Sequence, residues 1–219
     1  MPTYSNFSSL VSDVSNYLER GGSSATDNTV LQQIPRLINA AERKIVQILK
    51  LQGVIEVLVD QAGLPANVAV VGKPDRWRQT KSLKYAGGSD GVSYIPLYPR
   101  NYDFCRMYWP NDSKTSAPQF YADYDYFHWL IAPTPDITYP LEAVCYMQPP
   151  LLDQANQTNF FTNYTPNLLL YLTMLEATPF MKDDSRVPMW QSYADREVAS
   201  LITQDLQKIM DQASQRSGA

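Results

Sequence analysis

Residues 34–59 read IPRLINAAERKIVQILKLQGVIEVLV, and a change of period within them decides the fold. Up to Leu49 the apolar residues recur every three or four positions, which predicts one buried face of a helix. Pro35 is expected to kink this helix or to mark a restart at its first turn. From Gly53 the period changes, and the short β-branched run Val54–Val59 predicts a strand. The chain is therefore expected to pass from helices to a sheet near residue 53.

Two helices are predicted ahead of this change. The first covers about residues 5–20, because its apolar side chains fall on one helical stripe: Phe7, Leu10, Val11, Val14 and Leu18. Gly21-Gly22 is expected to end it. Thr26 or Asp27 is expected to cap a second helix that extends to about residue 51. The short Gly/Ser turn between them predicts an αα-hairpin.

The middle of the chain is predicted to be rich in strands. Short candidate strands alternate with turn residues, and they cover residues 54–59, 68–71, 77–85, 94–98, 119–124, 127–132 and 141–148. The glycine-rich segment Gly87–Gly91 is expected to be a hairpin loop, and Asn101–Trp109 fits either a short helix or a strand. Many short strands between such turns are typical of an antiparallel sandwich or barrel rather than of alternating strand–helix units.

Helical character returns in the last third of the chain. Thr165 is placed to cap a helix with Pro166 at its first position. The run LLLYLTML at residues 168–175 is apolar on nearly every face, so it should lie buried against the other helices and the sheet. Pro188 opens a last helix with the stripe Trp190, Ala194, Val198, Leu201 and Ile209. The polar tail from Gln212 is expected to be loose in the free monomer.

The predicted fold class is α+β. Two N-terminal and two C-terminal helices form a terminal α-helical bundle, and a central antiparallel β-sandwich or barrel-like insertion interrupts it. The predicted helical domain comprises residues 1–52 and 151–219, and the β-rich insertion domain comprises residues 53–150.

Composition argues against several classes of function. A net charge of -4 and a pI of about 5.0 disfavour a dedicated nucleic-acid binder held by phosphate contacts. Cys105 and Cys145 match no metal or redox spacing and are predicted to be small buried side chains in a reducing compartment. The N-terminus lacks a signal-peptide pattern, and no apolar run approaches the roughly 20 residues that span a bilayer. A soluble, intracellular protein is expected, at least during assembly.

One cluster stands out as a possible catalytic site. His128 is the only histidine, which removes most histidine-based triads and zinc sites. Asp123 and Asp125 lie near His128 and Trp129, an arrangement that can bind a divalent metal or, with its aromatic wall, a sugar. We favour a tight turn in which both aspartates accept local backbone hydrogen bonds. No catalytic, cofactor-binding or metal-binding residue is therefore predicted, and the protein is not expected to be an enzyme.

Charge is segregated along the β-rich region. Residues 73–106 carry seven basic and three acidic side chains, a balance of +4, whereas residues 111–147 carry one basic and five acidic side chains, a balance of -4. Such a split suits a head-to-tail contact between copies in a ring. The candidate inter-subunit residues are Arg76, Arg78, Lys81, Asp123 and Asp125. A basic, aromatic face for single-stranded nucleic acid and a plain solvated strand face are the alternatives.

Several segments in order resemble the head-to-tail adaptor (connector) proteins of tailed bacteriophages. The resemblance covers nearly the whole chain and is carried by Tyr4-Ser5 with Leu10-Val11, Ile34–Ile45, Phe120-Tyr121 with Ile131–Pro135, Thr162-Asn163 with Pro166–Tyr171, Leu175–Ala177, Phe180–Asp184, and Trp190 with Tyr193. It implies a structural virion protein with helices around a channel and a β domain that faces outward or down the tail.

The same resemblance implies the assembly and its partners. Usually twelve copies form a ring that docks on the portal protein and connects it to tail, nozzle or fibre proteins in the neck, and DNA passes the channel without specific binding during ejection. Such rings assemble in the host cytoplasm. The C-terminal segment Leu201–Ala219 would engage the portal, and the candidate contacts are Leu201, Leu206, Ile209 and Met210. The alternatives are another neck component, namely a stopper or tail terminator, and a carbohydrate-binding or carbohydrate-degrading β module.

Overall fold

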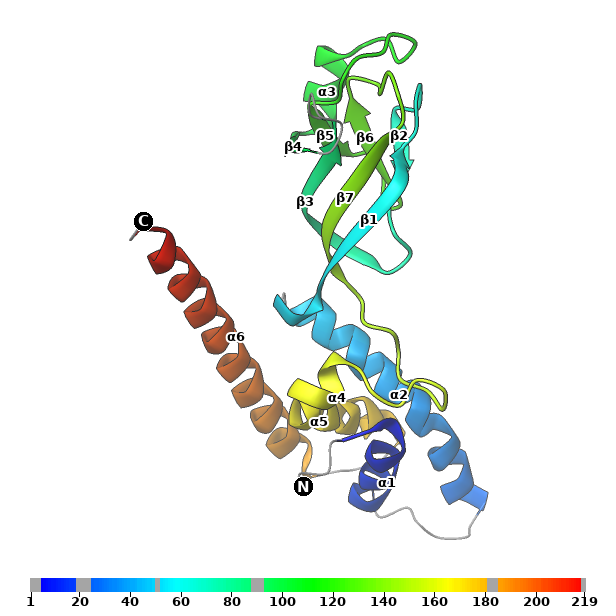
Figure 1. Ribbon diagram of the computed structural model, residues 1–219. Helices are drawn as coiled ribbons and strands as arrows, with labels where there is room; N and C mark the ends of the chain where they lie inside the picture. Colours follow the sequence, from blue (N-terminus) through cyan, green and yellow to red (C-terminus); the bar gives the residue numbers. More distant parts are fainter. Residues whose placement is uncertain (1–4, 19–24, 50–51, 88–92, 181–184, 218–219) are drawn as a thin grey trace. The chain divides into compact units, whose positions relative to one another are not determined.

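The computed structural model describes residues 5–18, 25–49, 52–87, 93–180 and 185–217 (Figure 1). The chain divides into two compact units, residues 1–54 with 148–219 and residues 55–147. Helices make up the first unit and a seven-stranded sheet with one helix makes up the second, so the predicted α+β class is confirmed. That residues 1–52 with 151–219 and residues 53–150 act as separate domains stays a prediction.

The helical unit is arranged around one buried helix. Its helices are α1 (Phe7–Tyr17), α2 (Ala25–Ile48), α4 (Phe160–Tyr164), α5 (Pro166–Ala177) and α6 (Val187–Ser217), with short 3-10 turns η1 (Gln52–Val54) and η2 (Thr178–Phe180). α5 packs against α1, α2, α4 and α6. As its all-round apolar sequence predicted, it buries side chains on several faces: Leu168, Leu169, Leu172, Thr173, Met174 and Ala177.

The helix boundaries differ in places from those predicted. The Asn6 side chain accepts the Ser9 N–H at 2.7 Å and caps α1, so this helix begins at Phe7. α2 begins at Ala25, ahead of the predicted caps Thr26 and Asp27, and continues through Pro35 without a restart. Thr165 precedes α5 as predicted, but its hydroxyl donates to the Phe161 carbonyl and makes no cap bond.

Further corrections concern the ends and the connections of the helical unit. α4 was not predicted, and α6 continues to Ser217 through most of the tail that was expected to be loose. The predicted Gly/Ser turn at residues 21–24 and most of the predicted loop Gly87–Gly91 lie outside the described residues. Gly53, where the sequence period changes, lies under the Phe160 ring, and a Cβ atom there would overlap that ring.

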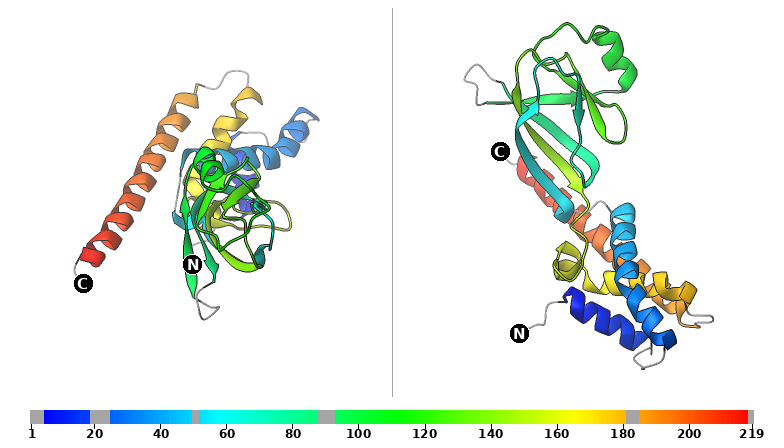
Figure 2. Two further views of the ribbon diagram at one scale, coloured as in Figure 1. Left: turned by 90° about the horizontal axis from the view of Figure 1, so that it is seen from above. Right: turned by 90° about the vertical axis from the view of Figure 1, so that its right-hand side faces the viewer.

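The sheet of the second unit is mixed rather than antiparallel. Its strands are β1 (Ile55–Leu64), β2 (Val70–Gly72), β3 (Trp77–Ala86), β4 (Tyr94–Pro99), β5 (Phe120–Asp123), β6 (His128–Ala132) and β7 (Tyr139–Met147), in the spatial order β1-β7-β3-β4-β5-β6-β2. β4 and β5 pair in parallel because helix α3 (Tyr102–Tyr108) connects them, and a parallel pair needs such a crossover. The sheet curls so that it is nearly closed (Figures 1 and 2).

Two apolar layers hold the sheet unit together. β7 alternates strictly between buried and half-buried residues, which is the pattern of a strand with one face in a core. The inside of the curled sheet holds large side chains: Leu64, Leu83, Tyr85, Trp129, Ile131 and Leu141. On the outside of β5 and β6, α3 buries Cys105 against small residues such as Ala122 and Ala132. Cys105 and Cys145 are both buried free thiols, as predicted.

Candidate functional site

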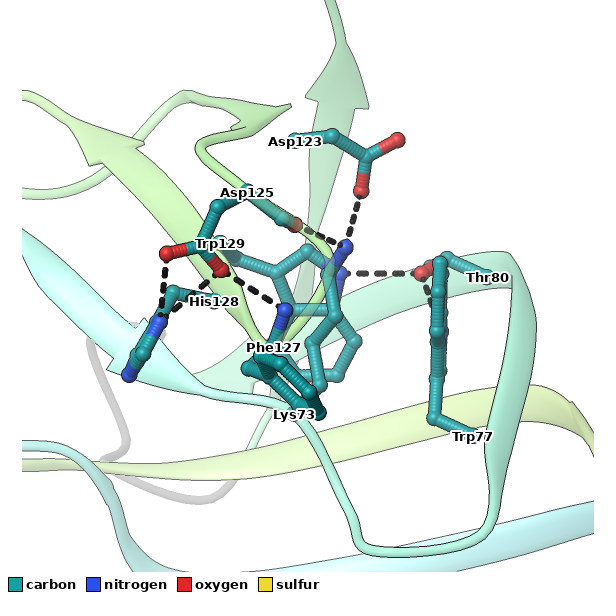
Figure 3. A network of polar contacts seen from close by, with 8 residues as sticks. All are labelled: Lys73, Trp77, Thr80, Asp123, Asp125, Phe127, His128 and Trp129. Carbon is teal, nitrogen blue, oxygen red and sulfur yellow. Dashed lines mark hydrogen bonds and ion pairs between the residues drawn. The ribbon is translucent and has the colours of Figure 1, made fainter.

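A buried lysine organises the acidic cluster that the sequence singled out (Figure 3). Lys73 follows β2, and its side chain is only 2% exposed. Its Nζ lies 2.6 Å from Asp123 Oδ1, donates to the Asp125 carbonyl at 2.9 Å and sits 3.8 Å from the centroid of the Trp77 ring. A buried ammonium requires such partners, so Asp123 completes a structural ion pair across the sheet.

Asp125 forms the tight turn that joins β5 to β6. Its Oδ1 accepts the Phe127 N–H at 2.6 Å, and both of its carboxylate oxygens lie 2.9 Å from His128 Nδ1. The hydrogen bond from His128 is the main cause that lowers the pKa of Asp125. The favoured turn interpretation is therefore confirmed for Asp125, whereas Asp123 pairs with Lys73 instead of local backbone.

The same geometry argues against the metal and sugar interpretations of this cluster. Within the part of the chain that the structure describes, no group of three or more His, Cys, Asp or Glu residues could hold a metal ion. Trp129, the proposed aromatic wall, is 1% exposed and lies in the core of the sheet unit. The exposed rings between β5 and β6 are Tyr124, Tyr126 and Phe127 instead.

A threonine links two strands beneath the turn, and this role was not predicted from the sequence. Thr80 Oγ1 accepts indole N–H bonds from Trp77 at 3.0 Å and from Trp129 at 2.9 Å. Burial raises the pKa of the Cys145 thiol to about 11, and a hydrogen bond with Thr80 partly offsets this shift. Thr80 and Trp129 are far apart in the chain and meet only because of how the strands are arranged in the sheet, which no local sequence pattern encodes.

Some of the charges that are segregated in the sequence meet within the sheet unit. Three ion pairs join the basic segment to the acidic segment: Lys73–Asp123 at 2.6 Å, Lys84–Glu142 at 3.1 Å and Arg106–Asp112 at 2.7 Å. Arg76 forms a two-point ion pair with Glu56 of β1. Three of the five candidate inter-subunit residues, Arg76, Asp123 and Asp125, therefore have partners in their own chain.

Arg78 and Lys81 are placed differently from the other basic residues. The β3–β7 register shifts between Trp77 and Gln79 and again between Thr80 and Ser82, so each of these two residues is the extra residue of a β-bulge. A bulge re-aims a side chain away from the regular ladder. Neither Arg78 nor Lys81 forms an ion pair with another described residue, and Lys81 is exposed.

The long helix α6 carries an exposed apolar face. Its first turns are anchored by Trp190 and Ala194, which are 4% and 2% exposed. Further on, Ile202, Leu206 and Met210 are 45%, 49% and 65% exposed. Their spacing of four residues places them on one helical stripe. Of the candidate portal contacts, Leu206 and Met210 lie on this stripe, Leu201 is half-buried beside it, and the Ile209 side chain is not described. Ile202 also lies on the stripe and was not predicted as a contact from the sequence.

The chain is an α+β protein whose polar clusters form internal ion pairs and hydrogen bonds. Apolar side chains remain exposed on the long helix α6. Exposed apolar side chains of this kind are typical of proteins that assemble with others. Residues 5–218 match the family model described as SU10 adaptor protein, and the chain belongs to this family. It is therefore a phage adaptor protein, and the resemblance to head-to-tail adaptors is confirmed. No curated protein sequence matches the chain. No described helix is long and apolar enough to cross a membrane.

Proposed function

We propose that this adaptor assembles as a ring, of twelve copies as in the proteins it resembles, that docks on the portal in the virion neck. The ring connects the portal to tail, nozzle or fibre proteins, assembles in the host cytoplasm and lets DNA pass during ejection. The observation that carries the proposal is the exposed stripe Ile202, Leu206 and Met210 on α6, because an apolar stripe on a solvent-exposed helix suits docking into a groove of another protein. A stopper or tail terminator is the second candidate, since it would use the same surface.

The two units supply different surfaces for this role. The helical unit, with α6, would build the ring and meet the portal, and the sheet unit would meet neighbouring copies and the tail. Internal carboxylates neutralise Lys73, Lys84 and Arg106, which are three of the seven basic side chains of residues 73–106 and are thereby less available to hold passing DNA. This arrangement supports a channel without specific DNA binding and a structural rather than catalytic protein.

Replacing apolar residues of the stripe by charged ones should abolish portal docking. The double change Leu206→Asp with Met210→Asp is expected to weaken binding to the purified portal by at least about 100-fold, because buried hot-spot side chains contribute roughly 2 kcal/mol or more. Native mass spectrometry and cryo-electron microscopy of the mixture measure this. Gln204→Asp, on the opposite face of the same helix, is the matched control and should dock normally. Undiminished docking of the double variant would exclude the stripe as the contact.

Arg78 and Lys81 remain our proposed contacts between neighbouring copies, and Arg76, Asp123 and Asp125 would take part through the internal pairs described above. Changing both Arg78 and Lys81 to glutamate should weaken the ring most at low salt, because exposed charge contacts are screened beyond about 10 Å at 0.1 M salt. The fraction of ring against salt concentration, from mass photometry, measures this. Lys84→Gln removes a charge that is already paired with Glu142 and is the control. Equal ring fractions for all three proteins would contradict the proposal.

A further inference from the structure

The curled sheet stops short of closure between two strands that follow each other in the chain. β1 and β2 are the two ends of the strand order, and each is paired on one side only, β1 with β7 and β2 with β6. They run antiparallel and are joined by a turn in which Asn67 has a positive φ of 62°. Such strands usually pair as a hairpin, but here they diverge from the turn.

A groove of about 590 Å³ occupies this gap. Its floor consists of the core side chains Trp129, Leu141 and Ala143. Its walls are residues 70–72 of β2 and five residues of β1, namely Leu58, Val59, Asp60, Ala62 and Gly63. At one end Val68 N–H closes the turn onto the Pro65 carbonyl, and beyond β2 the connection Lys73–Pro74 lines the other end. The groove is thus a short apolar slot between two free strand edges.

The polar groups of the slot belong largely to the backbone. The Ala69 carbonyl accepts the Ile131 N–H at 2.8 Å, and the Lys73 N–H donates to the Phe127 carbonyl at 2.7 Å, both toward β6. Because alternate residues of a strand direct their backbone groups to opposite sides, Val70 and Gly72 direct theirs away from β6 and into the gap. An apolar small molecule would leave these groups unpaired, whereas an extended polypeptide presents donors and acceptors at the same spacing.

An acidic residue at the rim of the groove favours an occupant with a basic side chain. Asp60 lies opposite Leu141 on β1, on the groove side, and it is exposed. One of its carboxylate oxygens accepts the Ala62 N–H at 3.0 Å, and the carboxylate still faces solvent at the edge of the slot. A basic side chain on the occupant would complement it. Five residues of β1 between Leu58 and Gly63 line the slot, and this part of the strand is roughly 20 Å long.

We propose that this slot binds a short extended segment of a partner protein, which adds a strand between β1 and β2. One apolar side chain of the segment would lie on Trp129, Leu141 and Ala143, and a basic side chain would lie at Asp60. The added strand would run antiparallel to one wall and parallel to the other. This goes beyond the adaptor function, because it assigns the sheet unit a peptide-binding site that is separate from α6.

A peptide panel tests the proposal on the full chain. Labelled six-residue peptides that alternate valine, leucine or phenylalanine with threonine, each with one lysine, are titrated while fluorescence anisotropy is recorded. At least one should bind below 1 mM, and replacing its central residue by proline should weaken it by at least about tenfold, since proline donates no backbone hydrogen bond. Binding should also slow hydrogen exchange at the amides of Val70 and Gly72. No binding by any peptide, or equal binding of the proline peptides, overturns the proposal.

Two variants of the protein sharpen the test. Ala143→Met fills the floor of the slot and should abolish peptide binding, whereas Val144→Met, the next residue on the outer face of β7, should bind as wild type does. Asp60→Asn keeps the acceptor for Ala62 N–H and should weaken lysine peptides while leaving the corresponding threonine peptides unchanged. If both methionine variants bind normally, or if Asp60→Asn affects all peptides alike, the slot is not the binding site.

Discussion

Replacing Glu42 by alanine should destabilise the helical unit more than any exposed substitution in it. Glu42 is fully buried on α2, and it accepts the Leu152 N–H at 3.1 Å and a short hydrogen bond from the Asn159 amide. The Asn39 amide, in the orientation that satisfies both of its ends, donates to the same carboxylate at 3.0 Å. Removal of the carboxylate leaves the Leu152 N–H and one N–H of each amide without an acceptor, at about 1–3 kcal/mol each, so the free energy of unfolding should fall by roughly 3 kcal/mol or more. The other N–H of each amide keeps its bond to the Pro150 or the Leu152 carbonyl.

The pH dependence of stability provides a second measurement of the same group. Burial raises the pKa of Glu42 from 4.5 to about 7, against the lowering effect of its hydrogen bonds and of Arg43. Between these two pH values the folded chain holds a proton that the unfolded chain has released. The contribution of Glu42 to stability is therefore full below pH 4.5, decreases as the pH rises and is lost above pH 7.

Glu42→Gln is the matched control for both measurements. It keeps the volume and one acceptor oxygen, so its loss of stability should be smaller than that of Glu42→Ala. It cannot titrate, so its unfolding free energy from urea denaturation should vary less between pH 5 and 7.5 than that of the wild type. Identical pH profiles for the wild type and Glu42→Gln would show that Glu42 titrates outside this range.

The parts of the fold that could be predicted from the sequence are those with a local signal. The stripe of α1, the all-round apolar run of α5 and the alternation in β7 each follow from the spacing of apolar residues within one element. The turn at Asp125 was predictable for the same reason, since an Asx turn involves residues only two positions apart.

The parts that were missed depend on which strands become neighbours. The parallel pairing of β4 with β5 depends on the path of the chain through α3, which no period reveals. Lys73 reaches Asp123 only because β2 and β5 both flank β6. The strand order thus brings basic and acidic segments that are separate in the sequence together as internal ion pairs. The bulges that isolate Arg78 and Lys81 are register shifts between β3 and β7, and a register is a property of two strands.

We expect Trp190 to anchor α6 more firmly than any other residue of this helix. Its replacement should therefore weaken portal docking more than any other change outside the exposed stripe. The indole is 4% exposed and contacts Tyr17 edge-on at 5.4 Å and Tyr171 at 5.9 Å between ring centroids. Trp190→Ala should lower the free energy of unfolding by about 3–5 kcal/mol through lost contacts and a cavity. Chemical denaturation measures this loss, and the portal-binding assay measures its consequence.

Trp190→Phe tests whether the aromatic contacts of this side chain are sufficient to anchor α6. The Trp190 Nε1–H is buried without an acceptor in the described structure, and leaving such a group unpaired costs about 1–3 kcal/mol. Phenylalanine removes this unpaired donor and keeps the aromatic contacts with Tyr17 and Tyr171, so stability and portal docking should stay close to wild type. If docking were lost in Trp190→Phe while its stability was retained, the indole would have to contact the portal directly. If Trp190→Ala kept both stability and docking, α6 would be held by contacts other than this aromatic cluster.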